Sequence, residues 1–168
     1  WCDILIIKFT QSILLLLGGE FNSYFVVGEN SPSIDSLAMV DIAVNMQYTN
    51  NDGEIEQVEV VDVTKLDNEI NDYTAQNLIS VGMPCDNSVT ADILNTTECE
   101  FGLSENQALI ELSFHDTGYT TMIVRGYDSN MTRLAAQVIA NRTNDLEGRK
   151  ILISGTEYET ANLTVLGE

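Results

Sequence analysis

Basic side chains are scarce in this chain of 168 residues, which has 7 Lys and Arg against 26 Asp and Glu and a formal net charge of −19. A surface of that sign repels phosphate backbones, so nucleic acid is excluded as a partner. The chain also has a single His and no Cys-x-x-Cys pair, so it cannot complete the usual zinc ligand sets. These absences remove nucleic-acid binding and zinc chemistry from the functions to consider.

Catalytic motifs are missing as well. His115 and Asp116 are neighbours, but adjacent residues on a turn point apart, and no Gly-x-Ser-x-Gly elbow supplies a nucleophile. Gly28 follows a predicted strand, yet one glycine is not the Gly-x-Gly-x-x-Gly of a dinucleotide site. We expect His115 to lie in a hairpin and Asn30 or Ser31 to cap a helix. The sequence therefore predicts no catalysis and no organic cofactor.

Predicted strands and helices alternate along the chain. A strand over 21–27, a helix over 33–48 that is apolar around most of its circumference and therefore buried, and a strand over 55–63 make one β-α-β unit. The remaining predicted strands are 77–81, 108–114, 119–124, 150–153 and 158–165, and the remaining helices are 87–94 and 132–140. Such alternation predicts one α/β domain over 20–168, with a three-layer, flavodoxin-like or Rossmann-like sheet flanked by helices.

An apolar N-terminal arm over 1–19 precedes that domain. Its core, residues 4–17 (ILIIKFTQSILLLL), is shorter than the roughly 20 residues of a membrane span, so no transmembrane anchor is predicted. A strand-prone apolar run must be covered, either as the first strand of its own sheet or by addition to a neighbouring subunit. The candidate assembly residues are Ile4, Leu5, Ile6, Ile7, Phe9, Ile13, Leu14, Leu15, Leu16 and Leu17.

Cysteines and sequons are typical of an oxidising, extracellular compartment. Cys85 and Cys99 flank a short predicted helix, and a disulfide could close that loop; two buried free thiols are the alternative. Cys2 is left without an assigned partner. N-linked glycans are predicted at loops or element ends, where they could project into solvent. The four sequons are at Asn95, Asn130, Asn141 and Asn162.

Acidic clusters offer candidate calcium ligands. Asp52, Glu54 and Glu56 place several oxygens within a few residues, and strand alternation would put the two glutamates on one face. A structural Ca²⁺ could bridge them, although the spacing is not that of an EF-hand. The alternative is a solvated acidic edge that discourages wrong sheet pairing.

Four segments, in this order, resemble a domain of archaeal S-layer-like surface proteins: FVVGENSPSIDSLAMVDIA, LISVGMPCDNSVTADIL, VRGYDSNMTRLAAQVIANR and LISGTEYE. The domain is also similar to the cell-wall-binding repeats of bacteria. The most specific piece is Val-Gly-x-Pro-Cys followed by an Asn and a second Cys. This resemblance implies a bond between Cys85 and Cys99, an extracellular, often glycosylated, assembly-forming role, and no catalytic residues. The chain departs from the family at Met83, usually a Gly, and at Leu134, where an Arg is common.

Two functions remain open. The first is an extracellular structural protein at the cell surface, a subunit of a self-assembling layer, tube or filament whose partners are copies of itself. The second is a module that binds cell-wall or surface carbohydrate. Sugar sites usually display exposed aromatic rings, and here aromatics make up 7% of the chain with Trp1 as the single Trp. This composition favours the structural hypothesis.

Overall fold

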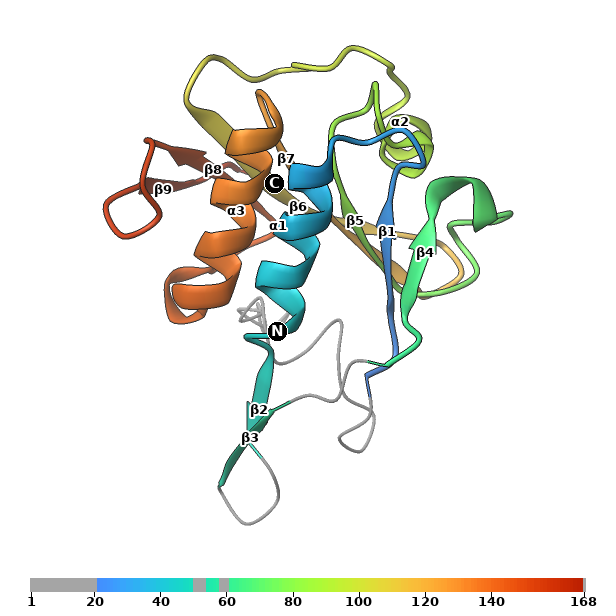
Figure 1. Ribbon diagram of the computed structural model, residues 1–168, viewed down its shortest axis with the longest axis horizontal. Coiled ribbons are helices and arrows are strands. Elements are labelled where there is room, and N and C mark those ends of the chain that lie inside the picture. Colours follow the sequence, from blue (N-terminus) through green and yellow to red (C-terminus); the bar gives the residue numbers. More distant parts are fainter. Residues whose placement is uncertain (1–20, 50–53, 58–60, 168) are drawn as a thin grey trace, which may run out of the picture.

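A computed structural model of the chain describes residues 21–49, 54–57 and 61–167, with the backbone alone at 47–49, 55 and 56. Its centre is a seven-stranded mixed sheet in the order β4-β1-β5-β7-β6-β8-β9 (Figure 1). The strands are β1 Tyr24–Val27, β4 Thr64–Leu66, β5 Leu78–Val81, β6 Gln107–Phe114, β7 Thr120–Gly126, β8 Lys150–Ser154 and β9 Asn162–Val165. Strands β4, β1, β5 and β7 are parallel, whereas β6 is antiparallel to β7 and β8, and β9 is antiparallel to β8.

Helices cover both faces of this sheet. Helices α1 (Ser33–Ala43) and α3 (Ser129–Asn141) pack side by side over the main core, and α2 (Ser88–Leu94) packs on the other face with η1 (Asp67–Glu69). Successive strand side chains point to opposite faces, so Phe25 and Val27 join the main core while Val26 contacts the second cluster. A short 3-10 turn, η2 (Thr143–Asp145), follows α3. The predicted α/β class is confirmed, but its flavodoxin-like or Rossmann-like type, the arm over 1–19 and the domain division stay predictions.

The β-α-β unit closes at a strand other than the predicted one. Strand β1 pairs with β4, which begins at Thr64, whereas Ile55–Gln57 forms β3 and pairs with β2 (Gln47–Thr49) in a separate hairpin. The prediction that the strand over 55–63 closes the β-α-β unit was wrong, because β4 takes that place as an edge strand, which needs no apolar run. Its Lys65 instead lays its ammonium group over the ring of Tyr24, 4.1 Å from the centroid.

Helix α1 is shorter and less buried than the sequence predicted. It ends at Ala43, and its buried side chains are Asp35, Ala38 and Ile42. On the opposite side three large apolar residues are exposed, namely Leu37, Val40 and Val44 at 48%, 44% and 53%. A helix that is apolar all round gives no periodic signal, so the sequence could not show which side meets the sheet and α3.

Candidate functional site

The carboxyl ends of the parallel strands β1, β5 and β7 meet at one edge of the sheet, where open α/β sheets bind ligands. Here the chain itself fills the edge. A Cβ on Gly28, directly after β1, would lie 1.6 Å from the carbonyl oxygen of Asp86, and one on Gly126 would lie 2.3 Å from the nitrogen of Thr132. Both positions therefore exclude a side chain because backbone passes directly over them.

Asp35 is the central side chain of this edge and is fully buried, with an exposed fraction of 0%. Burial raises its pKa to about 6; the neighbouring hydroxyls of Ser129 and Ser31 lower it, and the charge of Asp86 raises it. Within the described part of the chain, neither carboxylate oxygen accepts a hydrogen bond of normal geometry. An acid at this helical position often accepts from the backbone N–H of the N-cap residue, but that residue is Pro32 and has no N–H.

The predicted cap of α1 by Asn30 or Ser31 was wrong, because the helix begins at Ser33, too late for either residue to cap it. Pro32 holds the N-cap position without a side-chain cap, and the hydroxyl of Ser31 donates to the carbonyl of Asp86 at 3.4 Å instead of capping the helix. Sequence reasoning also missed Asp35. The available signal was an acidic residue three positions after Pro32 inside a mostly apolar helix.

Asn87 joins β1, β5 and α2 with one buried side chain. Its amide nitrogen donates to the carbonyls of Val81 at 3.0 Å and Val26 at 3.3 Å. Its oxygen caps α2 by accepting from the backbone N–H groups of Val89 and Thr90 at 3.1 and 3.3 Å. With both donors and its oxygen in use, the group is satisfied as a buried amide must be.

A disulfide joins Cys85 to Cys99, with their Cα atoms 4.8 Å apart, and so confirms the predicted pair. The bond closes the segment that contains α2. Met83 fits the turn that precedes α2. Its carbonyl accepts hydrogen bonds from the backbone N–H groups of Asp86 and Asn87, and its φ is not positive, so the position does not require a Gly. Leu134 is a buried core residue, 3% exposed, at the position where the resembling family often has Arg.

Arg125 holds the loop after α2 against the second face of the sheet. Its guanidinium is buried, donates to the carbonyl of Phe101 at 2.7 Å and lies 5.9 Å from the centroid of that ring. Burial lowers its pKa, and the charge of Glu111 opposes that change. Glu111 in turn pairs with Lys150 across β6 and β8 at 3.0 Å. These charged groups serve packing between elements.

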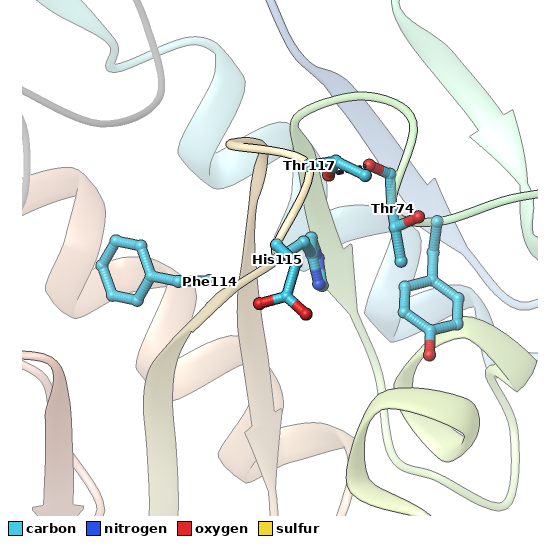
Figure 2. A pocket seen from close by; sticks show the side chains of 6 residues that line it. Thr74, Phe114, His115 and Thr117 are labelled. Carbon is cyan, nitrogen blue, oxygen red and sulfur yellow. Dashed lines mark hydrogen bonds between the residues drawn. The ribbon is translucent and has the colours of Figure 1, made fainter.

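His115 lies in the β6–β7 hairpin, as predicted, and lines an open hollow of about 360 Å³ (Figure 2). Its Nε2 lies 2.9 Å from the hydroxyl of Thr121, and the ring of Tyr73 is tilted against it with centroids 5.5 Å apart. Burial lowers the pKa of His115, which the charge of Asp72 partly offsets. None of the residues that line the hollow is a Ser or Cys that His115 could activate: Tyr73, Thr74, Phe114, His115, Asp116 and Thr117.

All four sequon asparagines are exposed and lie at the ends of elements. Asn95 is the left-handed C-cap of α2, with a φ of 51°. Asn130 is in the first turn of α3 and Asn141 is its last residue. Asn162 begins the edge strand β9. A glycan at any of them has access to solvent, and their occupancy stays a prediction.

Several predicted site residues lie outside the described residues. These are the assembly candidates in 4–17, together with Cys2, Asp52 and the side chain of Glu56; Glu54 is described and exposed. In residues 21–49, 54–57 and 61–167 no three His, Cys, Asp or Glu side chains gather so that they could hold a metal ion. The same ranges contain no helix with the length and apolar character needed to cross a membrane.

Comparison with known proteins places the described elements in a family. No curated protein matches the chain. A model of the S-layer like family, outer domain, matches residues 60–143, which is half of the 168-residue chain. The match runs from β4 to the end of α3 and includes Asn87 and the Cys85–Cys99 disulfide. The chain therefore belongs to the S-layer like family that this outer-domain model describes.

Proposed function

We propose that this chain is an extracellular structural protein, a subunit of a self-assembling layer, tube or filament at the cell surface, and that it has no catalytic activity. The observation that carries this proposal is the match to the outer-domain model of an S-layer like family over residues 60–143. A family of surface-layer proteins favours a structural role and a location at the cell surface.

The use of buried polar groups supports the proposal. Asn87 bonds three elements together, Arg125 bonds a loop to the sheet, and Gly28 lets backbone cross the edge where a ligand would sit in a doubly wound enzyme. Each of these residues serves the rigidity of the domain. A rigid unit suits a lattice, because a lattice repeats one subunit geometry many times.

The partners in this proposal are copies of the same chain, joined through the apolar residues of 4–17. N-linked glycans on Asn95, Asn130, Asn141 and Asn162 would cover parts of the free surface and leave the remainder for contacts between subunits. A structural Ca²⁺ held by Asp52, Glu54 and Glu56 would screen the negative charge that otherwise opposes close packing of such acidic subunits.

Electron microscopy of the purified full chain, with and without Ca²⁺, tests this function. We expect regular sheets, tubes or filaments without any added polysaccharide, and intact-mass measurement of native material is expected to show added hexose masses and one disulfide. A chain that stays monomeric by sedimentation at high concentration, in Ca²⁺ as well as in chelator, would contradict the proposal.

The hollow beside His115 favours one alternative, a carbohydrate-binding module. An aromatic ring from Tyr73, a carboxylate from Asp116 and the hydroxyl of Thr117 surround about 360 Å³, enough for a small polar ligand. Calorimetry with isolated wall polysaccharide tests it. Binding that is lost in Tyr73→Ala would support the alternative, whereas no heat from the wild-type chain would remove it.

A further inference from the structure

The exposed side of α1 is apolar where a surface helix is normally polar. Leu37, Val40 and Val44 are spaced three and four residues apart, so they share one side of the helix, and each is 44–53% exposed. We call these three residues the outer face of α1. Exposed apolar residues at this spacing on a chain of net charge −19 mark a site of interaction.

The charged side chains of α1 point away from the outer face. Helix α1 contains two charged residues, Asp35 and Asp41. Asp35 is buried on the side of the sheet, and Asp41 bonds the guanidinium of Arg133 on α3 at 2.8 Å. The carboxylate of Asp41 is therefore held toward α3. An apolar partner could approach the outer face without displacing a solvated charge from α1.

The same chain supplies a segment that fits the face. Residues 4–17 contain one charged side chain, Lys8, in a run that is otherwise mostly apolar. Lys8 is complementary in sign to the acidic surface that any copy of this chain presents. The segment therefore offers apolar side chains for the outer face and a positive charge for its surroundings.

Length and position allow contact with a neighbouring copy. The described chain starts at Phe21, just before β1. Helix α1 follows β1 and runs in the opposite direction, so the carboxyl end of α1 lies at the same end of the molecule as the start of β1 (Figure 1). The outer face spans only about 10 Å along α1. A segment of 14 residues, the length of 4–17, reaches roughly 45 Å when extended.

We infer that residues Ile4–Leu17 of one copy dock on the outer face of α1 of a second copy. The inference rests on the proposed function, because it names the surface through which the subunits assemble. The donor segment and the receiving face are different parts of the chain, so the contact is heterologous and propagates into an open polymer. Each copy then covers its neighbour's exposed apolar face and has its own segment covered.

Two full-length variants separate the two halves of this contact. The face variant carries Val40→Thr and Val44→Thr, which keep the shape of the side chains and add a hydroxyl. The segment variant carries Leu14→Glu and Leu16→Glu. We expect each variant alone to be monomeric in sedimentation velocity, with an association constant lowered about 100-fold, equivalent to roughly 2.7 kcal/mol.

Mixing the two variants gives the decisive measurement. The face variant still donates a segment and the segment variant still offers a face, so the mixture is expected to form heterodimers that grow no further. Val165→Glu is the matched control, since Val165 is 57% exposed but lies on the edge strand β9, away from α1. It should assemble like the wild type.

The outcomes separate this inference from the proposed function. A wild-type chain that never assembles overturns the proposed function, and the inference with it. A wild-type chain that assembles while the face variant assembles equally well overturns the inference alone. Variants that are monomeric alone and in the mixture also overturn it, because the intact segment of one variant then fails to bind the intact face of the other. Circular dichroism and an intact disulfide establish that each variant is folded.

Discussion

The carboxylate of Asp67 accepts a hydrogen bond of 2.8 Å from the backbone N–H of Ser88, the first residue of α2. Its other oxygen accepts from the backbone N–H of Glu29, also at 2.8 Å, in the turn after β1. One acid at the start of η1 therefore ties together the loops that leave two neighbouring strands. Burial alone would raise its pKa, but the bonds from Ser88, Glu29 and Asn68 outweigh burial and lower it.

Replacing Asp67 by Ala should destabilise the domain by about 2 kcal/mol at pH 7, since two backbone donors lose a charged acceptor. The pKa of Asp67 is lower in the folded chain, so its contribution is present above the unfolded pKa near 4 and disappears as the pH falls through the folded value. Urea unfolding at pH 7 and at pH 2.5 measures both effects. Asp92→Asn, an exposed acid on α2, is the control and should change little.

Asp35→Asn is expected to stabilise the domain at pH 7. The pKa of Asp35 is raised to about 6 from 3.8, so the folded state binds this proton more tightly than the unfolded state. The free energy of unfolding is therefore highest below pH 4, where Asp35 is protonated in both states. It falls by about 3 kcal/mol as the pH rises through 6, which corresponds to the size of the pKa shift. The neutral Asn removes that loss. Denaturation curves of both proteins should agree near pH 4 and diverge toward pH 7; a constant deficit for the variant would refute this.

Gly28→Ala should prevent folding or cost more than about 3 kcal/mol. The new Cβ would overlap the carbonyl oxygen of Asp86, 1.6 Å away, and that oxygen belongs to backbone held by the disulfide and by Asn87. Gly102→Ala is the matched control, because nothing lies within 4 Å of its Cβ and only its φ of 69° opposes the change. We expect a loss of about 1 kcal/mol there. Thermal melts of the two variants would reveal equal losses if close packing at Gly28 were unimportant.

Removing the Cys85–Cys99 bond by changing both residues to Ser should cost about 3 kcal/mol, since the bond closes a loop with a sequence separation of 14. Loss of native near-UV circular dichroism in dithiothreitol should parallel the effect of the double substitution. Cys2→Ser, which leaves the bond intact, is the control. A double variant as stable as the wild type would mean that packing of the loop by Arg125 and Phe101 suffices.

Local features of the fold could be predicted from the sequence because neighbouring residues decide them. The helix predicted over 87–94 forms with Asn87 as its cap, and His115 to Gly118 close a hairpin between the two predicted strands. The Cys pair flanks the short helix that it encloses. In each case the interaction lies within about fifteen residues, so composition and spacing carry the information.

The sequence alone determined an acidic α/β chain with its helices, most of its strands, its hairpin and its exposed sequons, because these follow from periodicity, turn residues and charge. Only the tertiary structure decided that Thr64–Leu66 pairs with β1, that Asp35 is buried beside Ser129, and that Leu37, Val40 and Val44 are exposed. The physical reason is competition for space. Helix α3, more than eighty residues further along the chain, packs against one side of α1 and buries it. No local pattern in the sequence of α1 indicates which side that is.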